Sequence, residues 1–182
     1  MLILRDVYKK INRITWQEHF LWPLEIDSGR NETIMKDKPD DSISLEISFH
    51  APLADVWKAW TDSASILKWI GSDPKGVGLK AHMDVHPGGV FEITFSGSDR
   101  VEHTCFGIYT EVKELRKLIF SWEWKNEPGV ESLVIIELVP DGNDTKMQFE
   151  HTGVGNRSMH NYLEGWTKTF EKLKQLLDQK RI

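Results

Sequence analysis

The sequence predicts an α+β fold, in which a curved antiparallel sheet of six to seven strands surrounds a long C-terminal helix. First, residues 156–179 carry apolar side chains mostly three and four positions apart, which is the spacing of one helix face. Second, the segments before that helix alternate apolar and polar residues, as half-buried strands do. Third, two short helical patterns follow the first strand. Only the sheet offers a surface large enough to cover the broad helix face.

The first part of the predicted domain contains one strand and the two short helices. Residues 43–49 alternate apolar and polar side chains and predict the first strand. Residues 56–60 predict a short helix with an apolar face, and residues 66–70 predict a second one. Asp62 or Ser63, between them, is suited to cap the second helix.

The middle of the chain reads as an antiparallel meander. Turn signals rich in Pro, Gly, Asn and Asp separate apolar segments of strand length. Such closely spaced strands joined by tight turns favour pairing between neighbours along the chain. The predicted strands are residues 79–86, 90–96, 101–113, 118–125, 133–139 and 145–151.

The C-terminal helix would be about 36 Å long at about 1.5 Å per residue. Gly165 lies inside it, where glycine costs about 1 kcal/mol relative to alanine. We therefore expect a packing reason: close approach of the helix to the sheet, or clearance at the mouth of a cavity. The apolar face consists of Met159, Tyr162, Leu163, Trp166, Phe170, Leu173, Leu176 and Leu177.

The composition is that of one ordinary domain of 182 residues, 40% of them hydrophobic. The formal net charge of −5 argues against nucleic acid or a membrane surface as the main partner, because both attract clustered Lys and Arg. The single cysteine, Cys105, fits a reducing compartment, so we expect a cytoplasmic protein. Eight tryptophans are many for this length, and such rings fill cores or line pockets for apolar ligands.

Residues 1–40 do not share the pattern of the rest, so we divide the chain into this extension and a domain over residues 41–182. The extension is either an amphipathic helix that ends before Pro23 or a loosely attached segment. A helix there could dock on a second copy, which leaves a homodimer open. Because Met35 could start a shorter protein, the extension is alternatively an artefact of the gene model. Its apolar residues include Val7, Ile11, Ile14, Trp16, Phe20, Leu21 and Trp22.

Several short motifs in the domain occur in a characteristic order. They are Ala51-Pro52-x-x-x-Val56-Trp57-x-Ala59-Trp60-Thr61, His86-Pro87-Gly88-Gly89-x-Phe91, Gly107-x-Tyr109-x-Glu111-Val112, Leu118-x-Phe120-x-Trp122, Gly142-x-x-Thr145 with His151, and Gly165-Trp166. With this order of elements, residues 43–178 resemble the helix-grip fold of the Bet v 1-like and START-related (SRPBCC) superfamily. More narrowly, they resemble the family named after the activator of the Hsp90 ATPase.

This resemblance implies an apolar cavity between the sheet and the C-terminal helix. Many members of the superfamily bind lipids, polyketides or hormones there, and a few are enzymes, such as polyketide cyclases. The co-chaperone that names the family carries a second, N-terminal domain, for which we expect no room in a chain of this length. Because fold does not imply function, the family name alone does not transfer an activity.

The aromatic residues of the domain are the candidates for the cavity wall, and the alternative for each is an ordinary core position. Trp122 on its strand and Trp166 on the helix form the best pair, because these two elements should face each other. The predicted cavity residues are Trp57, Trp60, Trp69, Phe91, Phe95, Tyr109, Phe120, Trp122, Trp124, Phe149, His151, Leu163, Trp166 and Phe170.

Polar residues offer weaker signals. His82, Asp84 and His86 could share a strand face and hold a metal, but a solvated face explains them equally and no CxxC or HExxH spacing supports a metal. His151 is either a general acid or base in a dry pocket or a core histidine bonded to a backbone carbonyl. His103 reads as exposed polarity near a hairpin. We therefore predict no catalytic residue, no metal and no cofactor.

The leading prediction is a non-catalytic domain that binds a small apolar or amphipathic ligand between helix and sheet. Tyr109, Glu123 and His151 could orient such a ligand. The second hypothesis is a module that binds a chaperone or another protein through an exposed apolar patch, including Trp16, Phe20 and Trp22. The third is a cyclase-like or hydrolytic enzyme with an acid–base pair in the cavity.

Overall fold

The computed structural model describes residues 41–154 and 160–179. Residues 1–40, and with them the predicted N-terminal helix and the candidate start at Met35, lie outside the described residues. The described part contains seven strands and three helices. These are β1 (Ser42–Phe49), α2 (Leu53–Thr61), α3 (Ser63–Ile66), β2 (Val77–Met83), β3 (Val90–Ser96), β4 (Glu102–Lys113), β5 (Lys117–Trp124), β6 (Ser132–Asp141), β7 (Asp144–Thr152) and α4 (Tyr162–Asp178).

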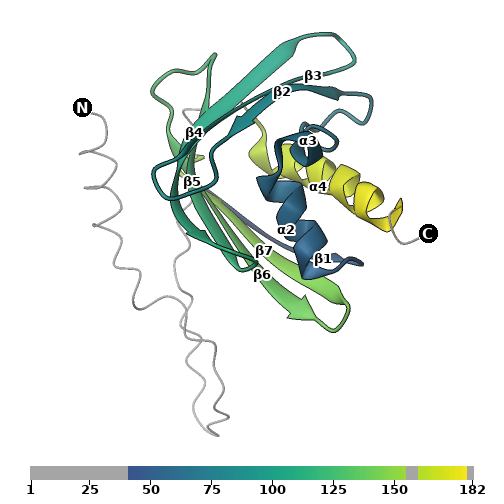
Figure 1. Cartoon of the computed structure of the whole chain (residues 1–182). Helices are drawn as coiled ribbons and strands as arrows, with labels where there is room; N and C mark the ends of the chain where they lie inside the picture. The colour runs from purple at the N-terminus through teal and green to yellow at the C-terminus, as the bar shows by residue number, and fades with distance from the viewer. Residues whose placement is uncertain (1–40, 155–159, 180–182) are drawn as a thin grey trace, which may run out of the picture. The chain divides into compact units, whose positions relative to one another are not determined.

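The seven strands form one antiparallel sheet in the order β1-β7-β6-β5-β4-β3-β2. Strands β2 to β7 are therefore a meander, as predicted, and β1 closes the far edge by pairing with β7. The sheet bends around α4, and α2 and α3 lie on the same side of it (Figure 1). Register shifts at Gly78/Lys80 and at Tyr109/Glu111 interrupt the ladders, and such bulges increase the local twist and bend of a sheet.

The alternation in β5 shows why the sheet has one buried face. Leu118, Phe120 and Trp122 are 1%, 4% and 4% exposed, and they point toward α4. Ile119 and Glu123, which alternate with these residues along β5, are half-buried and lie on the opposite face, because successive side chains of a strand alternate. This strand therefore supplies a row of large rings to the core.

The first short helix agrees with its prediction, whereas the second is shorter. Asp62 caps α3 as expected, since its carboxylate accepts a hydrogen bond from the backbone N–H of Ser65 at 2.9 Å. A second short helix is present as predicted, but its predicted bounds of 66–70 are wrong, because α3 ends at Ile66. After Ile66 the next backbone N–H groups bond three residues back, Lys68 to Ser65 and Trp69 to Ile66, which makes a tight turn in place of a longer α-helix.

The C-terminal helix begins later than predicted. Asn161 caps it by accepting the N–H of Glu164 at 3.2 Å, so α4 starts at Tyr162, and the predicted first turn falls largely on residues 155–159, outside the described residues. Leu163 is 51% exposed, so its assignment to the buried face is wrong. It is rotated about 100° from Tyr162, which already lies at the edge of that face. The buried residues are Tyr162, Trp166, Thr169, Phe170, Leu173 and Leu177.

Candidate functional site

Aromatic rings fill most of the space between α4 and the sheet. Trp166 is at the centre, with ring centroids 4.6 Å from Phe149, 5.2 Å from Trp122, 5.4 Å from Phe170 and 6.1 Å from Trp60. The predicted contact between Trp122 and Trp166 is therefore present. A small inner cavity of about 10 Å³ lies within this cluster. Its wall consists of Trp60, Ile66, Ile70, Met83, Phe91, Ile93, Tyr109, Phe120 and Trp122.

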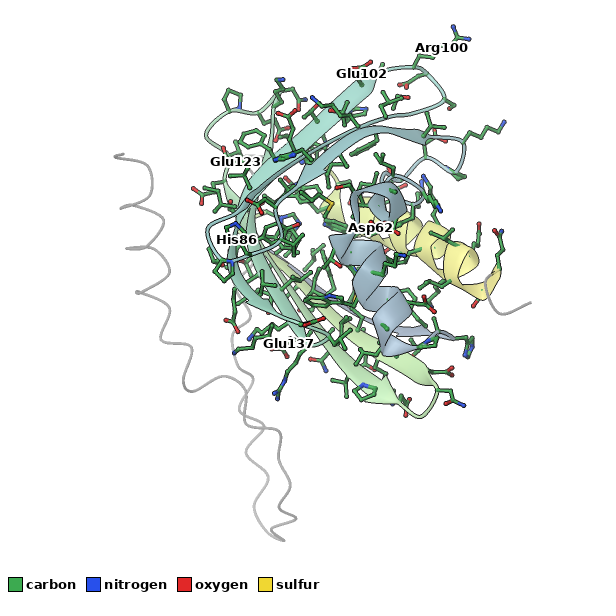
Figure 2. All side chains as sticks on the ribbon, in the orientation of Figure 1. Asp62, His86, Arg100, Glu102, Glu123 and Glu137 are labelled. Atoms are coloured by element: carbon green, nitrogen blue, oxygen red, sulfur yellow. The ribbon has the colours of Figure 1, made fainter. Side chains whose placement is uncertain are left out.

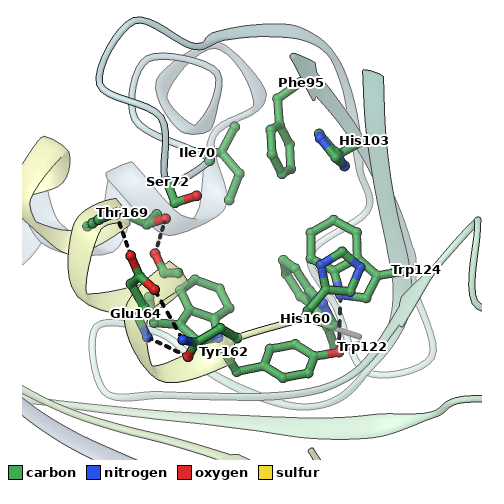
Figure 3. Close-up of a pocket in the computed structure, with 15 residues that line it drawn as sticks. Ile70, Ser72, Phe95, His103, Trp122, Trp124, His160, Tyr162, Glu164 and Thr169 are labelled. Carbon is green, nitrogen blue, oxygen red and sulfur yellow. Dashed lines mark hydrogen bonds and ion pairs between the residues drawn. The ribbon is translucent and has the colours of Figure 1, made fainter. Parts of the chain in front are cut away.

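A larger outer cavity, of about 340 Å³, lies at the N-terminal end of α4. It is bounded by the first turns of α4, by strands β3 to β5 and by the loop that follows α3. Figure 3 shows these side chains arranged around an open centre, with Ile70 and Phe95 opposite Tyr162. Its wall consists of Ile70, Gly71, Ser72, Phe95, His103, Trp122, Trp124, His160, Asn161, Tyr162, Glu164, Gly165, Trp166, Lys168 and Thr169.

The inner part of the outer cavity is aromatic and fixed. The indole N–H of Trp124 donates to the hydroxyl of Tyr162 at 3.1 Å, which joins the sheet to the start of α4. Phe95 and Trp122 both contact Trp124, with ring centroids 6.0 and 5.4 Å away. A wall of packed rings presents apolar surface to a ligand and holds its own shape.

The mouth of the outer cavity is polar. Lys168 and Glu164 form an ion pair of 2.6 Å across one turn of α4. His160 stacks on Trp124 with a centroid distance of 4.4 Å, and its Nε2 is 3.6 Å from the carboxylate of Glu127. Burial lowers the pKa of His160, against the opposing effect of Glu127, and His103 lowers it further. This histidine is therefore mainly neutral near pH 7.

The loop after α3, residues 70–73, forms one side of the outer cavity and is held by hydrogen bonds at two points; we call it the tied loop. Lys172 of α4 donates to the backbone carbonyls of Ile70, Gly71 and Asp73 at 3.1 to 3.3 Å. The Asp73 carboxylate accepts the backbone N–H and the hydroxyl of Ser98 on the β3–β4 hairpin. These hydrogen bonds lower the pKa of Asp73 to about 2. The loop is thus bonded to both the helix and the sheet.

His151 lies in the core and not at the outer cavity. The indole N–H of Trp166 donates to its Nδ1 at 2.9 Å, so Nε2 carries the proton and donates to the Ser132 hydroxyl at 2.7 Å. That hydroxyl in turn donates to the carbonyl of Trp122 at 2.9 Å. Burial lowers the pKa of His151 to about 3. The predicted direct bond to a backbone carbonyl is wrong, because Ser132 stands between the two groups.

The predicted cavity residues divide into three groups. Phe95, Trp122, Trp124 and Trp166 line the outer cavity. Trp60, Phe91, Tyr109 and Phe120 line the inner one, which Trp122 shares. Trp57, Trp69, Phe149, His151, Leu163 and Phe170 line neither, because ring packing closes the space around the buried ones and Leu163 faces outward.

Two polar residues are placed differently from their predictions. His103 was expected to be exposed, yet it lines the outer cavity, because it alternates with Thr104 and shares the inward face of β4 with Cys105. Glu123 was a candidate for orienting the ligand, but it lies between Trp122 and Trp124 on β5 and so projects from the outer face of the sheet (Figure 2).

The sequence missed most of the polar wall. The sequence pattern places His160 and Asn161 in the first turns of the helix, and it gives no signal for Ser72. Gly165 was correctly marked as unusual: a side chain added there would meet nothing within 4 Å, so clearance at the cavity and not close approach explains this glycine. The apolar pattern of a helix carries no signal for residues at its cap, which is why Asn161 was not found.

The described residues contain no group of three or more His, Cys, Asp or Glu side chains that could hold a metal ion. His86 bonds instead to Asp84, with Nε2 2.9 Å from the carboxylate. None of the helices in the described segments is long and apolar enough to cross a membrane.

The arrangement of a bent antiparallel sheet around one long helix, with two short helices after the first strand, defines a helix-grip domain of the Bet v 1-like class. Within that class the chain belongs to the family described as activator of Hsp90 ATPase homolog 1-like protein, whose model matches residues 50–178. A comparison with curated proteins finds no match.

Solved structures of similar fold come from several bacteria. A protein of Chromobacterium violaceum has a TM-score of 0.67 at 20% identity, over 75% of this chain and 96% of the other. The AHSA1 protein of Silicibacter pomeroyi has a TM-score of 0.67 at 23% identity, over 76% and 99%. CalU16 of Micromonospora echinospora has a TM-score of 0.56 at 23% identity, over 77% and 78%. At these identities the likeness establishes the fold alone.

Proposed function

We propose that the protein binds a small apolar or amphipathic molecule in the outer cavity. The observation that carries this proposal is the volume of about 340 Å³ walled by Phe95, Trp122, Trp124, Tyr162 and Trp166. Ligand pockets commonly have volumes of about 300–1,000 Å³ and mostly apolar walls with a few polar groups. The outer cavity lies at the small end of this range, which favours a compact ring system over a long acyl chain.

Binding would be driven by removal of apolar surface from water, at roughly 25 cal/mol per Å². Because the rings of Trp122 and Trp124 stand at 84° to each other, a flat ligand would stack on one of them and meet the other edge to face. Its solvent-facing end would meet the polar groups of Lys168, Glu164 and Asn161 at the mouth. The tied loop and the Trp124–Tyr162 bond keep the site formed before the ligand arrives, and a preformed site avoids the entropy cost of ordering.

Membership of the family is consistent with either ligand binding or a role like that of an Hsp90 ATPase activator. The cavity favours ligand binding, because a module that acts only through its surface has no need for a hollow next to a helix terminus. The apolar patch predicted for a chaperone partner involves Trp16, Phe20 and Trp22, which lie outside the described residues.

Filling the outer cavity tests the proposal. Gly165→Leu places a side chain where the structure has open space, and it replaces a helical glycine by a good helix former. Gln175→Leu adds leucine at an exposed position of the same helix and is the matched control. Each variant and the parent would be titrated with a naphthyl ketone while tryptophan fluorescence is recorded, and native mass spectrometry would detect any co-purified molecule.

We expect saturable quenching in the parent and in Gln175→Leu, and at least about tenfold weaker binding in Gly165→Leu, the equivalent of about 1.4 kcal/mol. Circular dichroism would verify that all three proteins fold. Equal affinity in the filled and parent proteins would rule out the outer cavity as the site. An empty parent protein that binds no apolar probe would leave a surface interaction, tested next with a purified Hsp90-type chaperone.

A further inference from the structure

In the part of the chain that the structure describes, two buried indole N–H groups have no acceptor. Trp69, Trp124 and Trp166 donate to the Ala59 carbonyl, the Tyr162 hydroxyl and His151. The N–H groups of Trp60 and Trp122 have no hydrogen-bond partner, although these residues are only 3% and 4% exposed. Buried polar groups of proteins are nearly always paired, so two unpaired donors of one kind require an explanation.

Both unpaired donors belong to residues that line the inner cavity. Its volume of about 10 Å³ is close to the space that one water oxygen needs. Ile70 and Trp122 form part of the wall of both cavities, and of these two only Trp122 has a side-chain hydrogen-bond donor. A molecule in the outer cavity therefore lies against the same ring whose N–H lacks an acceptor.

We infer that the bound molecule carries a neutral oxygen acceptor, such as a ketone, ester or amide carbonyl, that receives the indole N–H of Trp122 at the boundary of the inner cavity. Trp60 supplies a second donor for the same oxygen or for a water molecule beside it. This inference rests on the proposed function of the outer cavity and adds the chemical class of the ligand.

The acceptor is neutral because nothing in the inner wall balances a negative charge. All residues that line the inner cavity are uncharged, and burial raises the pKa of Tyr109, which keeps its phenol protonated. A carboxylate would lose its hydration here without gaining a cation, which is strongly unfavourable. A carbonyl oxygen loses much less and gains the hydrogen bond. The site should therefore select carbonyl compounds over both hydrocarbons and acids of the same shape.

The test compares two planar probes of nearly equal size, methyl naphthyl ketone and isopropenylnaphthalene, which differ in carrying C=O or C=CH₂. Their affinities would be measured for the parent protein, for Trp122→Phe and for Trp69→Phe, whose indole already has an acceptor. In parallel, nitrogen–proton correlation spectra of the indole groups would follow each titration, with the Trp122 signal assigned by its loss in Trp122→Phe.

We expect the parent to bind the ketone roughly three- to tenfold more tightly than the alkene, as one net hydrogen bond provides. This ratio should persist in Trp69→Phe and fall to about one in Trp122→Phe, and only the ketone should move the Trp122 indole signal downfield. Equal affinities in the parent, or a ratio unchanged in Trp122→Phe, would overturn the assignment of the acceptor while leaving the cavity as the site. Failure of both probes to bind would instead overturn the proposed function, and this inference with it.

Discussion

Trp166 on α4 donates its indole N–H to Nδ1 of His151 on β7, at 2.9 Å. This one bond fixes the tautomer of a buried histidine and joins the helix to the sheet. The proton on Nε2 then reaches the Ser132 hydroxyl, which bonds to the Trp122 carbonyl. These hydrogen bonds thus pair the polar side chains of Trp166, His151 and Ser132 inside an aromatic core, and each of them can be tested.

Acidification should destabilise the protein through His151. Its pKa is about 3 in the folded state against an ordinary value of 6.5, so between these values the unfolded chain binds a proton that the folded one does not. The stabilising contribution of the neutral histidine is complete above pH 6.5 and is lost as the pH falls toward 3, by up to about 1.4 kcal/mol per unit. Urea unfolding at intervals below pH 6.5 measures this slope.

His151→Gln is the matched variant for that slope, since an amide can accept from Trp166 and donate to Ser132 without titrating. Its unfolding free energy should depend less steeply on pH than that of the parent. A residual slope is expected from His160, whose pKa is also lowered by burial. Identical pH profiles for parent and variant would show that His151 does not control acid stability.

Ser132→Ala should cost about 1–3 kcal/mol, because it leaves the buried Nε2–H of His151 without an acceptor. Ser48→Ala removes a hydroxyl from an exposed position on β1 and should change stability by less than about 0.5 kcal/mol. Chemical denaturation of both variants at neutral pH measures the difference. Comparable losses in the two would mean that the hydroxyl at residue 132 contributes nothing specific.

Lys172→Met should weaken both stability and ligand binding. Its ammonium group donates to the carbonyls of Ile70, Gly71 and Asp73, and two of these residues line the outer cavity. We expect a loss of about 1–2 kcal/mol in unfolding free energy, since the group is only partly buried. Lys174→Met, at an exposed position two residues further on, is the control. If both variants bind the naphthyl ketone like the parent, the tied loop does not shape the site.

Two glycines should respond to alanine in opposite ways. A Cβ at Gly107 would lie 1.9 Å from the backbone carbonyl oxygen of Ser121 on the neighbouring strand, so Gly107→Ala must displace a strand and should cost more than about 3 kcal/mol. At Gly165 the same Cβ meets nothing within 4 Å, and alanine should stabilise α4 by up to about 1 kcal/mol. Thermal unfolding of the two variants measures whether each substitution raises or lowers stability. Stabilisation by Gly107→Ala would contradict the tight contact between the two strands.

Most of the fold could be predicted because its strands are half-buried. In β5 the alternation of Leu118, Phe120 and Trp122 with smaller or polar residues defines the inward face, and the turn signals set the pairing order. The end of α3 and the rotation of α4 were harder to predict. The end of α3 depends on a switch to hydrogen bonds three residues apart, and the orientation of Leu163 depends on how α4 is rotated against the sheet. Neither is encoded in a local apolar pattern.

The aromatic lining of the cavity could be predicted from the sequence, but its position could not. Aromatic composition indicated rings between helix and sheet, and Trp122 and Trp166 do meet there. Whether such rings enclose a hollow depends on how they stack, and here they close the centre and leave space at the helix terminus. Polar residues at that end, such as His103 and Asn161, lie on different elements, so their proximity arises only from the tertiary structure.

The pairing of β1 with β7 has a consequence for the order in which the chain can assemble. Ser42 lies opposite Thr152, so the first strand of the sheet pairs with the last one. Strands β2 to β7 can pair with their neighbours as they are synthesised, but β1 must remain without its partner until β7, the last strand of the sheet, has been made. Contacts between such distant segments slow folding. Closure of this edge and docking of α4 should therefore be late, coupled events in synthesis, and truncation before β7 should leave β1 as a free strand prone to aggregation.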